Sequence, residues 1–234
     1  MTRIALAQLA SNPKSIQENW EKHLAFINQA IEEKANAIFF PELSLSAYEP
    51  ELVSRMKKEL DGLPWNELKE LSHQHSIMIG IGLPIFTSQG VQIGMRIFNT
   101  DGQEFTYAKQ LLHEDELPYF IGGNEHLTLA IENHKIGIGI CYESLQPQHI
   151  ESVFAQNISM YLASVAKPQS AIERAYGIYS QTAKRFNTPV LLVNAVGKSD
   201  NFISCGQSAW WNPNGELQNN LSASEENLLL VHLP

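Results

Sequence analysis

The chain has 234 residues, of which 44% are hydrophobic and 18% charged, so it can bury a sizeable core and is not disordered. Acidic side chains outnumber basic ones by 25 to 16, which gives a net charge of −9. This balance argues against nucleic acid or an anionic membrane surface as the main partner, because both select for clustered lysine and arginine. The sequence has no signal-peptide pattern or membrane span, and its two cysteines are too few for a disulfide scaffold. We therefore expect a cytoplasmic protein folded as one domain over residues 1–234.

Strand-like and helix-like segments alternate along the whole chain. Apolar runs predict strands over residues 2–9, 37–40, 77–86, 127–131, 135–140, 158–163, 190–194, 208–211 and 228–233. Apolar residues at helical spacing predict helices over 15–34, 147–156 and 171–185, and over 49–75 with a break at Gly62 and Pro64. Turns at Asp101-Gly102 and Asn133-His134 indicate hairpins. Because hairpins require antiparallel pairs, the pattern predicts a layered α/β fold with helices over a mixed sheet.

Three reactive side chains follow predicted strands, where layered α/β proteins commonly place catalytic groups. Glu42 comes after the strand at 37–40, Lys109 ends the second arm of the 101–102 hairpin, and Cys141 ends the strand at 135–140. A nearby cation favours the thiolate form of a cysteine, and a carboxylate can take the thiol proton as a general base. Each residue alone also fits a structural role. Glu42 fits a surface turn or helix cap, Lys109 a solvated charge, and Cys141 a buried thiol. The spacing by itself leaves open whether the three meet.

Other chemistries fit the sequence less well. His73 and His75 are two residues apart on a predicted helix and point to different faces, so they do not form a metal pair. The Gly-x-Gly fragments at 80–82 and 137–139 lie inside strands instead of at a strand-to-helix turn, which argues against a dinucleotide site. A Cys-His-Glu glutaminase would need a histidine with a nearby acid after the cysteine. Only His149 and His232 follow Cys141, and the pair formed by His149 and Glu151 is too local. We expect neither a metal nor a cofactor.

Several motifs occur together in one order along the chain. They are Phe-Phe-Pro-Glu-Leu-Ser at 39–44, Tyr-Ala-Lys at 107–109, Gly-Ile-Gly-Ile-Cys-Tyr-Glu at 137–143, Asn-Ala-Val-Gly at 194–197 and Gly-Gln-Ser at 206–208. With these motifs the chain resembles the carbon–nitrogen hydrolase family, also called the nitrilase superfamily. The resemblance spans almost the whole chain and implies a four-layer α-β-β-α sandwich with a Glu-Lys-Cys triad.

The resemblance also implies a role for each member of that triad. Cys141 would attack the carbonyl carbon of an amide and form a thioester. Glu42 would accept the thiol proton, pass it to the leaving amine and later activate water. Lys109 and the backbone N–H of Tyr142 would stabilise the oxyanion, a contribution on the order of 3 kcal/mol for one preorganised donor.

Relatives often carry a second glutamate after the lysine, which orients the lysine and the substrate. Glu116 matches that position, although Glu114 and Asp115 lie close enough to leave the register open. The chain departs from common family patterns at 109–113, 144–148 and 175–177, which are pocket or interface positions. The resemblance therefore does not carry over a substrate.

We expect a metal-free thiol hydrolase that cleaves a small linear carboxamide or an N-carbamoyl compound. Amidase activity is favoured over nitrilase activity because amide hydrolysis is commoner among relatives. Two alternatives stay open: a non-catalytic binding or scaffold protein that keeps the sandwich, and an acyltransferase that passes the same thioester to an amine. Because relatives dimerise through the helices after the cysteine and the next strand, we expect a homodimer formed by residues 147–156 and 171–185.

Overall fold

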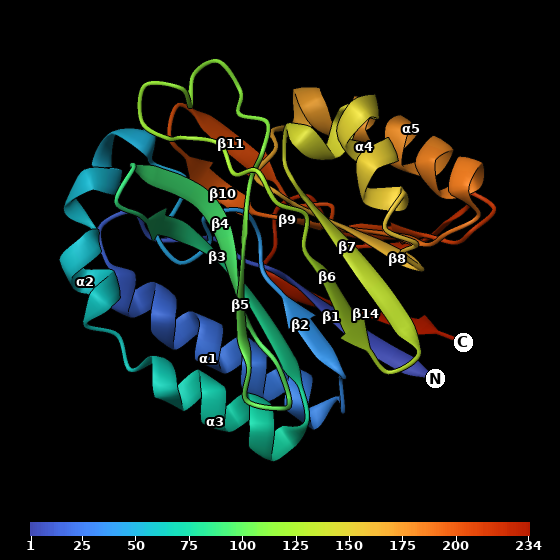
Figure 1. Ribbon diagram of the computed structural model, residues 1–234, viewed down its shortest axis with the longest axis horizontal. Coiled ribbons are helices and arrows are strands. Elements are labelled where there is room, and N and C mark those ends of the chain that lie inside the picture. Colours follow the sequence, from blue (N-terminus) through green and yellow to red (C-terminus); the bar gives the residue numbers. More distant parts are fainter.

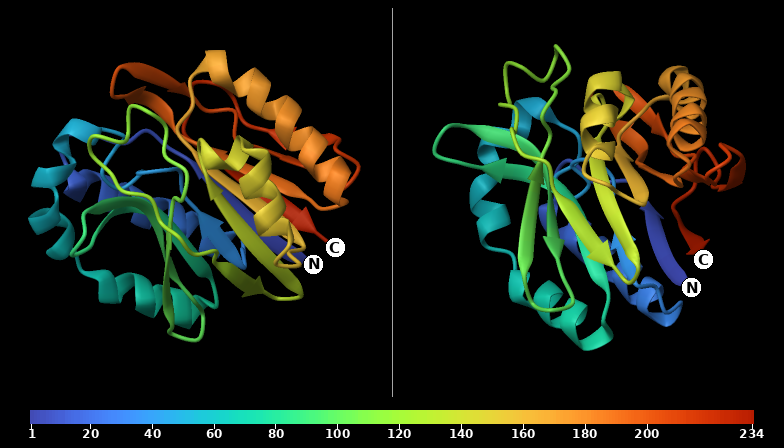
Figure 2. Two further views of the ribbon diagram at one scale, coloured as in Figure 1. Left: turned by 45° about the horizontal axis from the view of Figure 1, so that its top comes forward. Right: turned by 45° about the vertical axis from the view of Figure 1, so that its right-hand side comes forward.

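Two six-stranded sheets face each other at the centre of the protein, and helices cover their outer sides (Figure 1). The computed structural model describes all residues from Met1 to Pro234. From two further directions the helices again lie on opposite outer faces of the paired sheets (Figure 2). The layers therefore follow the order α-β-β-α, which confirms the sandwich expected from the sequence.

The first sheet has the strand order β14-β1-β2-β3-β4-β5. Its strands are β1 (Thr2–Gln8), β2 (Ala37–Phe39), β3 (Met78–Phe86), β4 (Val91–Phe98), β5 (Glu104–Ala108) and β14 (Asn227–Leu233). β1, β2 and β3 are parallel, whereas β4, β5 and β14 each pair antiparallel with a neighbour. Since β14 pairs with β1 along its full length, the two ends of the chain lie side by side (Figure 1).

The second sheet has the order β13-β12-β9-β8-β7-β6. Its strands are β6 (Thr128–Ile131), β7 (His134–Ile140), β8 (Met160–Val165), β9 (Val190–Asn194), β12 (Ala209–Trp211) and β13 (Leu217–Asn220). β7, β8 and β9 are parallel and form its centre. A separate two-stranded ribbon follows β9 and consists of β10 (Val196–Ser199) and β11 (Phe202–Cys205).

Helices complete the two outer layers. The first layer holds α1 (Ile16–Glu32), α2 (Lys57–Asp61), α3 (Trp65–His75) and the 3-10 helix η1 (Pro50–Arg55). The second holds α4 (Pro147–Phe154), α5 (Gln169–Phe186) and the 3-10 helix η2 (Glu143–Leu145). α1 begins where the hydroxyl of Ser15 accepts a hydrogen bond from the backbone N–H of Glu18 at 3.1 Å, a typical N-cap. No helix combines the length and apolarity needed to cross a membrane.

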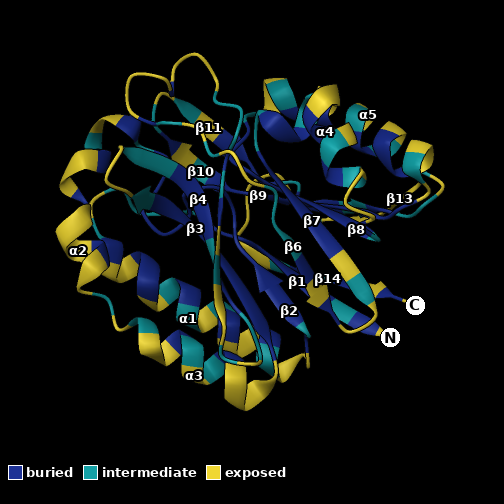
Figure 3. Cartoon of the chain, viewed as in Figure 1, coloured by how far each residue is buried: buried dark blue, intermediate teal, exposed yellow.

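The largest hydrophobic cluster lies between the two sheets. It contains 27 buried residues, including Leu6 and Phe39 of the first sheet and Ile138 and Val193 of the second. Two smaller clusters join each sheet to its helices. The strands are accordingly buried along their centres, while the outward faces of the helices are exposed (Figure 3). This packing fixes the two sheets relative to each other and hence the positions of the residues that follow their strands.

Most expected elements are confirmed, including the hairpin of β4 and β5 and the break between α2 and α3. The turn between β6 and β7 was misplaced by one residue. Ile131 pairs with His134, so the loop is Glu132-Asn133 instead of Asn133-His134. Strands β10, β11 and β13 are not among the elements expected from the sequence. β13 is exposed throughout, so it leaves no apolar pattern to detect.

Candidate active site

The predicted reactive residues lie where neighbouring strands end. Glu42 follows β2, Lys109 follows β5, and Cys141 follows β7. β2 and β7 belong to the parallel centres of opposing sheets, and β5 runs in the same direction as β3. The packing of the sheets thus brings the three residues together from separate elements.

Lys109 lies between two buried carboxylates. Its Nζ donates to Glu42 Oε1 at 2.7 Å and to Glu116 Oε1 at 2.6 Å. All three side chains are almost completely inaccessible to solvent. A buried charge is costly without a partner, so each member of this cluster depends on the others.

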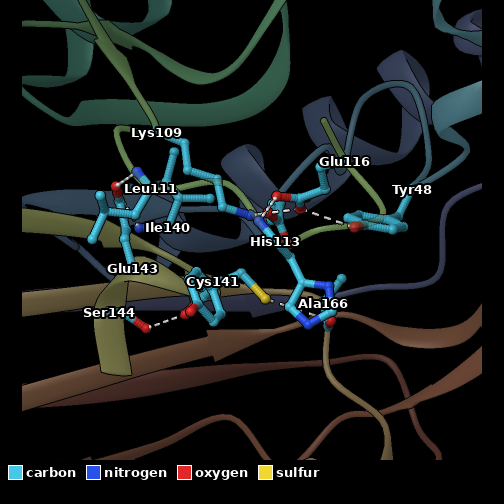
Figure 4. Close-up of polar contacts among 12 residues, drawn as sticks. Tyr48, Lys109, Leu111, His113, Glu116, Ile140, Cys141, Glu143, Ser144 and Ala166 are labelled. Atoms are coloured by element: carbon cyan, nitrogen blue, oxygen red, sulfur yellow. Dashed lines mark hydrogen bonds and ion pairs between the residues drawn. The ribbon is translucent and has the colours of Figure 1, made fainter. Parts of the chain in front are cut away.

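Glu116, and not Glu114, is the second glutamate that contacts Lys109. Tyr48 donates its hydroxyl to Glu116 Oε1 at 2.9 Å, and the backbone N–H of His113 donates to Glu116 Oε2 at 2.8 Å (Figure 4). Glu114 is exposed. The loop of residues 109–127 therefore folds back so that one glutamate reaches the lysine, which sequence spacing could not determine.

The charges of this cluster shift the ionisation of its members. Burial raises the pKa of Glu42, and the positive charge of Lys109 opposes that rise. Burial alone would lower the pKa of Lys109, but the charges of Glu42 and of its other acidic neighbours outweigh it and raise that pKa. These acidic neighbours therefore stabilise the charged form of Lys109.

Cys141 occupies a strained turn at the end of β7. Its φ of 46° lies in the left-handed region, which is unfavourable for a residue with a side chain. The backbone N–H of Cys141 donates to the carbonyl of Ser164 at 3.0 Å. The hydroxyl of Ser144 donates to the carbonyl of Cys141 at 2.6 Å (Figure 4). Gly139 allows this approach, because a Cβ there would collide with the side chains of Tyr161 and Ser144. The turn aims Sγ out of the sheet.

The thiol of Cys141 stays protonated at neutral pH unless a base acts on it. Burial and then the negative charge of Glu42 raise the pKa of this thiol to about 11, while Lys167 and Lys109 oppose the rise. Glu42 Oε2 is buried and has no hydrogen-bond partner. That free carboxylate oxygen, close enough to influence the thiol, is placed to accept a proton.

Tyr142 directly follows the cysteine and begins the turn into η2. No group of the chain accepts a hydrogen bond from its backbone N–H. An unpaired N–H beside Sγ can donate to an oxygen bound there, and Lys109 supplies a second donor nearby.

Glu143 was part of a sequence motif, but no role was predicted for it. Its Oε1 accepts from the Tyr107 hydroxyl at 2.7 Å and from the backbone N–H of Ile140 at 2.8 Å. Its Oε2 accepts from the backbone N–H groups of Gln110 at 2.6 Å and Leu111 at 3.2 Å (Figure 4). Burial raises the pKa of Glu143 to about 7, although these donors favour its ionised form. The carboxylate joins the segment after Lys109 to the segment that carries Cys141.

Lys167 was also missed. It comes two residues after the end of β8, and its Nζ lies 3.5 Å from Cys141 Sγ. The rule that drew attention to Lys109, a charged residue after an apolar strand, applies equally to Lys167.

A cavity of about 600 Å³ opens beside these residues. Its lining includes Tyr48, His113, Asp115, Glu116, Cys141, Tyr142, Ala166, Lys167, Arg174 and Phe202. The chain has no cluster of three or more histidine, cysteine or acidic side chains arranged to hold a metal. The cavity accommodates a small organic molecule next to the sulfur.

Comparison with known proteins identifies the family. The sequence model of the carbon-nitrogen hydrolase family matches residues 3–234. The chain belongs to this family. Among curated relatives, the glutamine-dependent NAD(+) synthetase of Acinetobacter baylyi is 29% identical over 92% of this chain and 41% of its own length. That of Aquifex aeolicus is 28% identical over 100% of this chain and 42% of its own length, so the chain spans about two-fifths of these relatives.

Solved structures of an amidase and of an NAD+ synthetase share the fold. The NitN amidase of Nesterenkonia sp. AN1 superposes with a TM-score of 0.89 at 21% identity, over 100% of this chain and 93% of the amidase. The glutamine-dependent NAD+ synthetase of Acinetobacter baumannii gives a TM-score of 0.86 at 25% identity, over 98% of this chain and 45% of the synthetase. These likenesses confirm the sandwich, and the match of the family model confirms the family resemblance expected from the sequence.

Proposed function

We propose that this carbon-nitrogen hydrolase cleaves a small linear amide through a thioester on Cys141. The observation that carries the proposal is the placement of Lys109 between Glu42 and Glu116, beside a half-buried thiol that lines the cavity. A nucleophile, a base and an oxyanion donor are what amide hydrolysis requires.

The first half-reaction forms the thioester. Glu42 takes the proton of Cys141, and Sγ attacks the carbonyl carbon while the carbonyl π electrons move to oxygen. Lys109 and the backbone N–H of Tyr142 stabilise that oxyanion. The C–N bond then breaks, and Glu42 gives its proton to the departing amine or ammonia.

The second half-reaction releases the acid. Glu42, again ionised, takes a proton from water as the water oxygen attacks the thioester carbon. The C–S bond breaks as the carbonyl re-forms, Glu42 returns its proton to the Cys141 thiolate, and the carboxylic acid leaves. Glu116 keeps Lys109 in place through both steps, because Tyr48 and the backbone of His113 hold its carboxylate.

Two substrate classes are the main candidates. A simple carboxamide or N-carbamoyl compound needs only the reacting groups already described. The side-chain amide of glutamine is the second candidate, because curated relatives are glutamine-dependent and the cavity carries an acidic group, Asp115, and a basic group, Arg174. Those charges are complementary to the ammonium and carboxylate of a free amino acid.

Ammonia release from a panel of amides, ureido acids, nitriles and glutamine tests the proposal. We expect turnover of at least one amide, no turnover with Cys141→Ala, and an acyl adduct on the peptide that contains Cys141. Cys205→Ala is the matched control, because its thiol is buried away from the cavity, and it should keep activity. Full activity in Cys141→Ala contradicts the proposal.

The two other readings of the site give different results in the same assays. A binding or scaffold protein would release no ammonia from any compound and form no adduct. An acyltransferase would yield a hydroxamate when hydroxylamine is added, with little free acid. Retention of Glu42, Lys109 and Cys141 together supports an enzyme over a scaffold.

We also propose that residues 1–234 act as one catalytic domain, because both sheets contribute to the site. We further propose that the protein works in the cytoplasm, where the free thiols of Cys141 and Cys205 stay reduced. We propose that the protein forms a homodimer through α4 and α5, which cover the outer face of the second sheet (Figure 2). Light scattering at micromolar concentration tests this assembly, and a monomeric mass contradicts it.

A further inference from the structure

We infer that Lys167, which lies outside the proposed Glu-Lys-Cys triad, is a second cation that stabilises the thiolate of Cys141; the inference rests on the proposed role of Cys141 as nucleophile. Nζ of Lys167 lies 3.5 Å from Sγ, and this is the only hydrogen-bond partner of the ammonium group within the chain. No carboxylate forms an ion pair with it, although the residue is only 6% exposed.

The backbone of Lys167 is fixed from two sides. Its N–H donates to Asn194 Oδ1 at 2.8 Å, and its carbonyl accepts from Asn194 Nδ2 at 3.2 Å and from the backbone N–H of Cys205 at 2.9 Å. Asn194 is itself anchored to the carbonyl of Gly206 at 2.7 Å. Burying an ammonium group without a carboxylate partner costs free energy. The position of the Lys167 ammonium beside Cys141 Sγ, on a fixed backbone, therefore argues against a role as a solvated surface charge.

The charge balance around the sulfur explains what this cation does. The titratable groups that influence or contact Cys141 are Glu42, Lys109, Glu116, Lys167, Tyr48 and Tyr179. Before attack, the negative charge of Glu42 lies against Lys109. When the S–H bond breaks and an O–H bond forms on Glu42, that charge moves to Sγ.

Lys109 Nζ also donates to Glu116 at 2.6 Å, so its positive charge is already paired with a carboxylate other than Glu42. Lys167 is in direct contact with the sulfur, and Lys167 lowers the pKa of the thiol more strongly than Lys109 does. The two lysines thus have separate tasks, Lys167 at the thiolate and Lys109 at the base and the oxyanion.

The experiment measures alkylation of Cys141 by iodoacetamide at pH 7.5, followed by mass spectrometry of the peptide. An opposite charge in contact shifts a pKa by about one to three units, and the accompanying rise in thiolate nucleophilicity offsets roughly half of the loss. Lys167→Met and Lys167→Gln should therefore slow alkylation by about 3-fold to 30-fold. Lys167→Arg, which keeps the charge, should retain most of the rate.

Lys198→Met is the matched control, because it removes an exposed positive charge outside the cavity and should not change the rate. Unfolding midpoints establish that each variant is folded at the assay temperature. The negatively charged reagent iodoacetate is run in parallel. If the neutral variants slow only iodoacetate, Lys167 is an anion-binding residue and the inference is overturned.

Unchanged rates with iodoacetamide, or equal losses in Lys167→Arg and the neutral variants, also overturn the inference. The assay measures alkylation of Sγ and not cleavage of a C–N bond, so its outcome can be distinguished from that of the hydrolysis assay. A protein without amidase activity can still show a thiol activated by Lys167, and an active amidase can show that Lys167 is dispensable.

Discussion

The backbone N–H of Gln110 donates to the carboxylate of Glu143 at 2.6 Å, and this bond connects the two loops that carry Lys109 and Cys141. The loops come from opposite sheets, β5 and β7, so their relative position depends on contacts across the interface. Glu143 supplies that contact from a fully buried position. The geometry of the site therefore depends on a residue that touches neither the thiol nor the lysine ammonium.

Replacing this carboxylate should separate the two loops. In Glu143→Gln one carboxylate oxygen becomes an amide NH2, which cannot accept a hydrogen bond from the buried N–H group that it faces. Each buried donor left without an acceptor costs about 1–3 kcal/mol of stability. We expect a loss of about 2–4 kcal/mol in the free energy of unfolding and a fall in kcat larger than any change in KM. Urea denaturation and steady-state kinetics measure both, and Glu173→Gln on the exposed face of α5 is the control. Wild-type stability in Glu143→Gln contradicts the connecting role.

The acid limb of activity should report Glu42. This residue accepts a proton only when ionised, and burial raises its pKa above the ordinary value of 4.5, so activity should disappear as pH falls through a midpoint above 4.5. The negative charge of Glu116 contributes to that rise. Glu116→Gln should therefore move the midpoint of kcat/KM to lower pH, whereas Glu114→Gln, at an exposed position, should leave it in place. An upward shift in Glu116→Gln would show that the base is not Glu42.

Removal of the central cation should destabilise the protein in a pH-dependent way. Lys109→Met leaves Glu42 and Glu116 as unpaired buried carboxylates, and breaking a buried ion pair costs about 3–5 kcal/mol. Burial already raises the pKa of Glu42, and without Lys109 that pKa lies further above the unfolded value, so the free energy of unfolding should fall as pH rises through that interval and recover in acid. Thermal unfolding from pH 4 to 8 measures this. The double variant Lys109→Met/Glu116→Gln should regain part of the loss, and simple additivity of the two single losses would refute the coupling.

The strain at the cysteine should be visible in stability. Cys141 has a φ of 46°, a conformation that costs a residue with a Cβ about 1–2 kcal/mol and that glycine adopts freely. Cys141→Gly should therefore be more stable than Cys141→Ala by about 1 kcal/mol, and both should be inactive. Chemical denaturation of the two variants decides the point. A more stable alanine variant would mean that the turn is not strained.

Many features of this protein could be predicted from local sequence. Apolar residues repeat every 3.6 positions after Ser15, which predicts a helix buried on one face. The continuous apolar runs at 37–40 and 135–140 predict strands buried on both faces. The motifs around Glu42, Lys109 and Cys141 also indicated the carbon-nitrogen hydrolase family. Strand β13 could not be predicted, because it is held by pairing with β12 and buries none of its residues.

The sequence by itself determined the order of all elements except β10, β11 and β13, the α/β class and the identity of three candidate reactive side chains. Only the tertiary structure decided that Glu116 instead of Glu114 reaches Lys109, that Glu143 links the two loops, and that Lys167 contacts the sulfur. Local patterns record which face of an element is buried, since burial repeats with the period of the helix or strand. Contacts between residues from different strands depend instead on how two sheets pack, and no periodicity along the chain encodes that arrangement.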